Sequence, residues 1–146
     1  MARGYPDYFG QSMYLRMGKV ELYHGVGIVC AFGAVTHILD VDNRMMIKAC
    51  RIILQDIAEP DSVNIEVTID ADVVADDSID TFYTNNVTKP DQGLIYCVVY
   101  APALERYVLQ FSMDLTIDTN ILINVNNVSA ADCTAEIMYL YGHILR

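Results

Sequence analysis

The chain has few basic residues. It carries nine Lys and Arg against 19 Asp and Glu, which gives a formal net charge of −10. Between Asp56 and Asp80 there are nine acidic residues and no Lys or Arg. Such a surface repels the phosphates of nucleic acids and of anionic membranes. We therefore expect no nucleic-acid partner and no membrane partner for the body of this protein.

The chain also lacks the motifs of common catalytic and metal sites. It has four cysteines, Cys30, Cys50, Cys97 and Cys133. They form no C-x-x-C pair and have no histidine at zinc-ligand spacing. No G-x-S-x-G nucleophile elbow occurs. We expect buried thiols, with one disulfide left open, and we expect neither an enzyme nor a cofactor.

No segment has the features of a signal peptide or of a membrane-spanning helix. Residues 1–18 lack the apolar core of a signal peptide. Residues 22–39 contain no Asp, Glu, Lys or Arg, but they include two histidines and three glycines, and Glu21 and Asp40 flank them. A membrane span needs about 20 mostly apolar residues. Two strands are expected in this region instead.

What the chain has in abundance is alternation of apolar and polar residues. Residues 107–117 alternate almost without a break, and residues 62–70 do the same. This period is typical of half-buried β-strands. Further strand patterns cover residues 20–30, 35–41, 121–126 and 133–141. In residues 94–100 the odd-numbered and the even-numbered positions are both apolar, which predicts a central strand covered on both faces. The pattern as a whole predicts an all-β sandwich or barrel of about eight strands.

Two segments are harder to interpret. Residues 43–60 contain four apolar residues at helical spacing, Met46, Cys50, Ile53 and Ile57. A helix would suit this spacing, but the neighbouring segments all have strand character, and we favour a strand through Leu54. Residues 71–93 are expected to be the longest irregular stretch, with room for a short helical turn.

Residues 1–18 differ in character from the rest of the chain. Four Gly or Pro residues alternate there with aromatic residues, and no helical or strand period is present. Disordered leaders are poor in aromatic residues, so we interpret 1–18 as an extended arm that lies on another surface. The β-sandwich domain then occupies 19–146. The predicted interface residues of the arm are Tyr5, Pro6, Tyr8, Phe9 and Tyr14.

An acidic cluster is the best candidate for a metal site. Its members are Asp70, Asp72, Asp76 and Asp77. Calcium prefers several oxygen ligands around one point. Read as an EF-hand loop, however, the segment has Ala75 where glycine is required. We therefore treat the four aspartates as weak candidates, and favour a solvated acidic segment that keeps a strand edge soluble.

Much of the chain resembles a known family. The similarity is carried by residues 107–145, YVLQFSMDLTIDTNILINVNNVSAADCTAEIMYLYGHIL. They resemble the C-terminal half of small jelly-roll proteins from tailed phages and related viruses. In those proteins a strand of the form Y-x-L-x-F-S-x-D-L leads through a short turn to L-x-I-x-V-x-N, and an aromatic-rich strand follows. Residues 64–74 (NIEVTIDADVV) are similar to the family's V-x-V-x-I-D-G hairpin, with Ala71 in place of the usual glycine, and residues 3–12 (RGYPDYFGQS) resemble openings of phage structural genes.

The resemblance implies a single jelly-roll-like antiparallel β-sandwich with an extended N-terminal arm. It also implies a virion component, assembled in the host cytoplasm, of the capsid decoration, minor capsid or fibre-like type. Such proteins are commonly homotrimers, so the implied partners are further copies of the chain and the major capsid or another virion protein. Because Tyr and Phe often anchor interfaces, the arm is the expected docking element.

Two alternatives of other classes stay open. The first is a carbohydrate- or receptor-binding module, which requires exposed aromatic side chains such as Phe82, Tyr83 and Tyr100. The second is an extracellular filament subunit whose arm adds a strand to the sheet of its neighbour.

Overall fold

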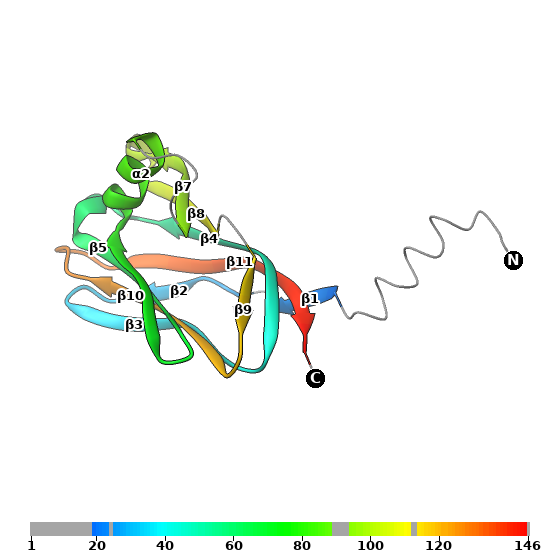
Figure 1. Cartoon of the computed structure of the whole chain (residues 1–146). Helices are drawn as coiled ribbons and strands as arrows, with labels where there is room; N and C mark the ends of the chain where they lie inside the picture. Colours follow the sequence, from blue (N-terminus) through cyan, green and yellow to red (C-terminus); the bar gives the residue numbers. More distant parts are fainter. Residues whose placement is uncertain (1–18, 24, 89–93, 112–113, 146) are drawn as a thin grey trace, which may run out of the picture.

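The computed structural model describes residues 19–23, 25–88, 94–111 and 114–145. One of its two sheets has seven strands. These are β1 (Lys19–Tyr23), β2 (Ile28–Cys30), β4 (Met45–Gln55), β7 (Ile95–Ala101), β8 (Arg106–Phe111), β9 (Leu115–Ile117) and β11 (Cys133–Ile144). Their order is β1–β11–β4–β8–β7; β2 also pairs with β11, and β9 also pairs with β4 (Figure 1).

The second sheet has four strands. They are β3 (Ala34–Asp42), β5 (Val63–Ile69), β6 (Asp72–Ser78) and β10 (Asn120–Asn127). Their order is β3–β10–β5–β6, and all pairings in both sheets are antiparallel. The prediction of an all-β antiparallel sandwich is confirmed, with more strands than the eight expected.

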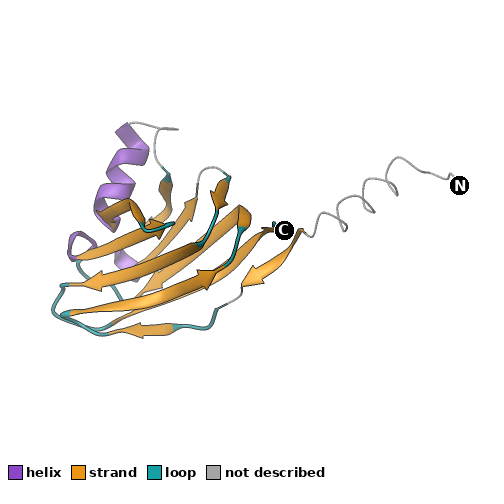
Figure 2. Cartoon of the chain, turned by 60° about the horizontal axis from the view of Figure 1, so that its bottom comes forward, coloured by secondary structure: helices purple, strands orange, loops and turns teal. Residues whose placement is uncertain are grey.

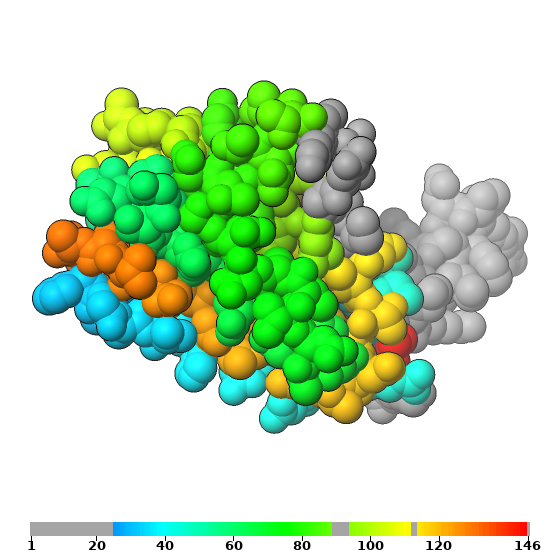
Figure 3. Space-filling model, turned by 60° about the vertical axis from the view of Figure 1, so that its left-hand side comes forward, coloured from blue at the N-terminus to red at the C-terminus, as the bar shows by residue number. Residues whose placement is uncertain are grey.

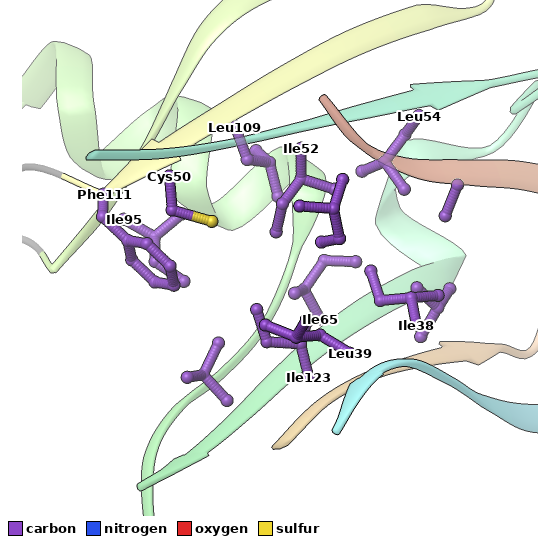
Figure 4. Close-up of a cluster of buried hydrophobic side chains, with 14 of the residues drawn as sticks. Ile38, Leu39, Cys50, Ile52, Leu54, Ile65, Ile95, Leu109, Phe111 and Ile123 are labelled. Carbon is purple, nitrogen blue, oxygen red and sulfur yellow. The ribbon is translucent and has the colours of Figure 1, made fainter. Parts of the chain in front are cut away.

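The core lies between the two sheets. In β5 the apolar residues Val63, Ile65 and Val67 are buried, and the residues between them are half-buried. Side chains of both sheets, such as Ile52 from β4 and Ile123 from β10, meet in the layer between them (Figure 4). Removing one such side chain from water contributes about 1.5–3 kcal/mol. The period of two in the sequence is the signature of this two-layer packing.

Strand β4 confirms the strand favoured for residues 43–60 and explains the helical spacing there. Its buried residues are Met45, Ile47, Cys50, Ile52 and Leu54. The step from Ile47 to Cys50 is three residues instead of two. At this point the pairing with β11 passes from Ala49 to Ile47, which leaves Lys48 as the extra residue of a β-bulge. Because of this bulge, odd-numbered residues of β4 face the core before Lys48 and even-numbered residues face it afterwards. The resulting three-residue step between buried residues resembles the spacing of a helix.

The expectation of an irregular segment at 71–93 is wrong for most of that range. β6 pairs with β5 as an edge strand, and α2 (Ile79–Thr88) follows it directly. The hydroxyl oxygen of Ser78 accepts a hydrogen bond from the backbone N–H of Thr81 at 3.1 Å, which caps the helix. Buried Ile79 and Phe82 anchor α2, which contacts β7 (Figure 1) and lies at one end of the sandwich (Figure 2).

Two further strand predictions need correction. β7 is the edge strand of its sheet and not a central one. Its pairing with β8 shifts between Cys97 and Val99, so apolar residues occur on both parities although Val98 and Val99 are exposed. The alternating stretch 107–117, expected as one long strand, is divided between β8 and β9, both of which pair with β4.

The β5–β6 hairpin ties the two sheets together. Its two turn residues, Asp70 and Ala71, have φ of 52° and 73°, the positive values that tight two-residue hairpins use. The Asp70 carboxylate accepts hydrogen bonds from the backbone N–H groups of Asp118, Thr119 and Asn120, at 2.7–3.2 Å. These residues form the turn from β9 in one sheet to β10 in the other. The Asp70 side chain therefore fixes the turn at which the chain passes from β9 in one sheet to β10 in the other.

Candidate interaction surface

Four side chains form a row across the outer face of the seven-stranded sheet. Tyr139 of β11 lies opposite Arg51 of β4, and Arg51 also lies opposite Gln110 of β8. Gln110 in turn lies opposite Tyr96 of β7. Residues directly opposite in antiparallel strands project to the same side. Since the next row, which contains Ile52, belongs to the core, the four side chains share the face that points away from it.

A second, more apolar row runs beside the first. Ile53 lies opposite both Glu136 and Val108, and Val108 lies opposite Val99. Val108 is only 8% exposed although it does not belong to the core cluster. We define the Tyr-Arg face by the two rows and the adjoining Tyr141, that is, by Arg51, Ile53, Tyr96, Val99, Val108, Gln110, Glu136, Tyr139 and Tyr141.

Arg51 organises the centre of the Tyr-Arg face. Its Nε donates a hydrogen bond to Gln110 Oε1 at 3.2 Å, and its Nη2 donates to the same oxygen. The guanidinium carbon lies 5.9 Å from the centre of the Tyr139 ring, within the range of a cation–π interaction. The Tyr139 and Tyr141 rings are 5.2 Å apart. Within the described part of the chain, no ion pair joins Arg51 to a carboxylate.

The hydroxyl of Tyr96 is not part of the accessible surface. Its oxygen is buried and has no hydrogen-bond partner among the described residues. A buried hydroxyl without a partner costs about 1–3 kcal/mol relative to a hydrogen-bonded one. What the Tyr-Arg face offers to a partner is therefore aromatic area and the Arg51 guanidinium, which has no carboxylate partner among the described residues.

The outer face of the four-stranded sheet has a different chemistry. His37, Asn124 and Glu66 lie side by side on β3, β10 and β5. Asn124 Nδ2 donates to Glu66 Oε1 at 3.0 Å, and Asn124 Oδ1 bonds to His37 Nδ1. Four carboxylates project from this face, those of Asp40, Asp42, Glu66 and Asp76, and its strands contain no Lys or Arg. We refer to it as the acidic face.

Several exposed apolar residues surround one end of the sandwich. They are Val26, Val29, Phe32, Val35 and Val128, which are between 57% and 77% exposed. The backbone N–H of Gly33 donates to the carbonyl of Asn127, so the β2–β3 and β10–β11 connections lie side by side (Figure 3). Val29 lies opposite Thr134 on the outer face of the large sheet, near the Tyr-Arg face, whereas Val35 lies opposite Asn126 on the outer face of the small sheet.

The acidic residues proposed as weak metal candidates do not converge. The Asp70 carboxylate is occupied by backbone N–H groups, and hydrogen bonds from Thr119 and Asp118 lower its pKa below the usual value. Asp72, Asp76 and Asp77 are distributed along the edge strand β6 and are exposed. In the ranges that the structure describes, no three His, Cys, Asp or Glu side chains are placed to hold a metal ion.

The predicted arm residues Tyr5, Pro6, Tyr8, Phe9 and Tyr14 lie outside the described residues. The aromatic residues required for carbohydrate binding lie inside them, and they do not form an open platform. Phe82 is buried. Tyr83 stacks on Tyr100 with ring centres 4.1 Å apart, and the Tyr100 hydroxyl donates to Asp80 Oδ1 at 2.7 Å.

Several titratable groups in and around the core have pKa values that keep them protonated at neutral pH. Burial raises the pKa of Cys50 to about 12 and that of Cys97 to about 11. These thiols are protonated at neutral pH and are poor nucleophiles. The hydrogen bond to Asp80 raises the pKa of Tyr100 to about 12. An open hollow of about 220 Å³ is lined by Asp56, Ala58, Glu59, Ser129, Ala130 and Ala131. The Ser129 hydroxyl in it donates to Asn127 Oδ1 and to the Ala131 carbonyl and, within the described residues, bonds to neither carboxylate of the hollow.

No known protein family matches this sequence, and no curated protein matches it. The resemblance to jelly-roll proteins of tailed phages therefore stays a prediction. None of the helices in the described ranges has the length and apolar character needed to cross a membrane.

Proposed function

We propose that this chain is a non-enzymatic structural protein of a virion, of the capsid decoration or minor capsid type. It self-associates through the Tyr-Arg face and docks onto the major capsid or another virion protein through the arm at residues 1–18. Assembly takes place in the host cytoplasm, and no cofactor, nucleic acid or membrane takes part. The observation that carries the proposal is the composition and charge of the Tyr-Arg face.

The composition of this face is that of an interface centre. Tyr and Arg are enriched where proteins meet, and Lys, Glu and Asp are depleted there. The Tyr-Arg face has three tyrosines, an arginine and three aliphatic residues, with Glu136 as its one acid. Its charges sum to zero in a chain whose net charge is −10. Contact between copies there avoids the repulsion that their other surfaces impose.

A homotrimer would use the contrast between the two outer faces. In a closed ring of three, each contact joins two different patches. Arg51 has no carboxylate partner among the described residues, whereas Asp72 and Asp77 are exposed on the edge strand β6, which contains no Lys or Arg. The Arg51 cation of one subunit and the β6 edge of the next are complementary in charge, which favours a heterologous contact.

The strand pairing supports a jelly-roll topology for the sandwich. We count β1 with β2 as one broken strand and β8 with β9 as another, and we set β7 aside. Of the resulting eight positions, the first pairs with the last, the second with the seventh, the third with the sixth and the fourth with the fifth. A ribbon of such pairs rolled into two sheets is a jelly roll. This topology agrees with the virion assignment but does not by itself specify a function.

Charge reversal at the centre of the Tyr-Arg face tests self-association. We expect the full-length chain to sediment as a trimer and the Arg51→Glu variant as a monomer, because the variant loses the cation and adds an acid. Arg44→Glu is the matched control, since Arg44 is an arginine in the β3–β4 connection that forms an exposed ion pair with Asp118 at 3.7 Å. A monomeric parent protein, or trimers of Arg51→Glu at unchanged affinity, would contradict the proposal.

Deletion of residues 1–18 tests docking separately. We expect the truncated protein to keep the β-rich circular dichroism spectrum and the trimeric state of the parent, but to be absent from purified particles. Normal incorporation of the truncated protein would overturn the role of the arm and leave the Tyr-Arg face as the surviving docking candidate.

A further inference from the structure

Two of the four cysteines lie directly opposite each other. Cys30 is the last residue of β2, Cys133 is the first residue of β11, and the two are register partners in the antiparallel pairing of these strands. Both side chains belong to the core cluster, with exposures of 0% and 2%. Because directly opposite residues project to the same side of the sheet, the two thiols lie side by side toward the core.

This arrangement satisfies the geometry of a disulfide. Directly opposite residues of antiparallel strands have Cα atoms about 4.5–5.5 Å apart. A disulfide requires Cα atoms about 4.4–6.8 Å apart. The bond between Cys30 and Cys133 therefore needs side-chain rotation and no displacement of either strand.

The other two cysteines cannot substitute for this pair. Cys50 lies in β4 and Cys97 in β7, with β8 between them. Two strand spacings amount to about 9.5 Å, which is beyond the limit of about 7 Å for bridging without backbone movement. Cys50 pairs with Leu140, seven residues along β11 from Cys133. These two thiols therefore serve as internal controls.

We propose that Cys30 and Cys133 are a redox-active pair that forms a disulfide under oxidising conditions and fastens the edge strand β2 to β11. The oxidant is a small-molecule disulfide. One cysteine thiolate attacks it, forms a mixed disulfide and releases one small thiol. The second cysteine loses its proton, attacks the sulfur of the first and releases the other small thiol. Two protein thiols are thus oxidised, and one small disulfide is reduced to two thiols.

Either thiol can make the first attack once an oxidant reaches it. Oxidants reach the pair when β2 opens, because short edge elements fray at low free-energy cost. β2 has only three residues, and its middle residue Val29 and the following Phe32 are exposed.

The bond has a consequence for the surface of the molecule. Val29 and Phe32 belong to the segment that the disulfide would fasten. In the reduced protein this segment is held by the pairing of β2 with β11 and by hydrogen bonds from Asn127 Nδ2 to the Cys30 carbonyl and from the Phe32 N–H to Asp132 Oδ1. The disulfide adds a covalent link to β11, which limits the opening of this segment. The inference does not depend on the virion assignment, since it concerns strand geometry alone.

The test uses the full chain in redox buffers of reduced and oxidised glutathione, with the product mapped by peptide mass spectrometry. We expect loss of the mass of two hydrogens, and one cross-linked peptide pair that contains Cys30 and Cys133. The oxidised form should melt roughly 5–10 °C higher than the reduced form, since a closed loop restricts the unfolded chain.

Two variants separate the proposal from general oxidation. The Cys50→Ala, Cys97→Ala double variant should form the same cross-link, and Cys30→Ala should form none. The proposal is overturned if the parent protein yields only glutathione adducts, stays fully reduced in oxidised glutathione, or forms a bond that includes Cys50 or Cys97. Because mapping of the unmodified chain decides between these results, misfolding of a variant does not affect the conclusion.

Discussion

The two outer faces of the sandwich have the same backbone and opposite chemistry. On the acidic face, Asn124 bonds to both His37 and Glu66, and the carboxylates of Asp40, Asp42 and Asp76 are exposed. On the Tyr-Arg face, Arg51 has an aromatic ring and an amide as partners and no carboxylate among the described residues. Exposed carboxylates are well hydrated and suit a surface that faces solvent, whereas aromatic rings around a guanidinium suit a surface that meets a partner.

The largest effect should come from removing the aromatic centre of the Tyr-Arg face. We expect Tyr139→Ala to weaken self-association by about 2–4 kcal/mol, because buried tyrosines are frequent hot spots. Thermal unfolding of the subunit should change much less, since the side chain is half-buried on the outer face. Sedimentation equilibrium measures the first quantity and differential scanning fluorimetry the second. Equal loss in both would mean that Tyr139 is simply part of the folded subunit.

The reverse result is expected on the acidic face. Asn124→Ala should destabilise the subunit by about 1–3 kcal/mol, because Glu66 and His37 lose their hydrogen-bond partner in a position that is largely covered. Asn124 is 7% exposed. Urea unfolding measures the loss of subunit stability, with Tyr139→Ala as the reference variant. If Asn124→Ala impairs trimer formation while the unfolding midpoint stays constant, the assignment of the two faces must be exchanged.

A smaller, pH-dependent effect is expected where the sheets are linked. The pKa of Asp70 is lowered by its backbone hydrogen bonds, so its stabilisation is fully present above the unfolded value near pH 4 and is lost as the pH falls through the lower folded value. Asp70→Asn keeps an acceptor oxygen but removes the charge. The variant should therefore unfold at a higher pH than the parent in an acid titration followed by circular dichroism. Coincident acid transitions would show that the turn at 118–120 does not need a charged acceptor.

The smallest change concerns the core between the faces. The Tyr107 hydroxyl is buried without a described partner, and Tyr107→Phe removes it. We expect the free energy of unfolding to stay within about 1 kcal/mol of the parent value or to rise. Tyr96→Phe should behave in the same way, because the hydroxyl of Tyr96 is also buried without a partner among the described residues. A clear loss of monomer stability in Tyr107→Phe would reveal a partner for its hydroxyl.

Much of the fold could be predicted from alternation alone. Strands β5 and β10 follow the period of two because each has one face on the core. The prediction failed where that period is absent for a physical reason. β6 is an edge strand whose acids project to solvent, and α2 has a poor helical sequence that is held by the Ser78 cap and by two buried residues, Ile79 and Phe82. In α2, tertiary packing therefore outweighs the low helix propensity of the sequence.

The candidate surface could not be assembled from the sequence. Arg51, Tyr96, Gln110 and Tyr139 are distributed over four strands, and only the register brings them into one row. A partial signal was present, because Arg51 and Tyr139 occupy outward-facing positions of otherwise apolar strands. Register, however, depends on bulges such as the one at Lys48, which shifts all later residues of β4 to the opposite parity. A local pattern does not contain that information.

The position of β11 has a consequence for how the molecule is made. It lies between β1 and β4, yet it is synthesised after both of them. On the ribosome, the four strands β3, β5, β6 and β10 are all available once residue 127 has emerged, whereas β1 and β4 must wait for a common neighbour. The smaller sheet is therefore expected to form first and to act as the template on which the larger one closes.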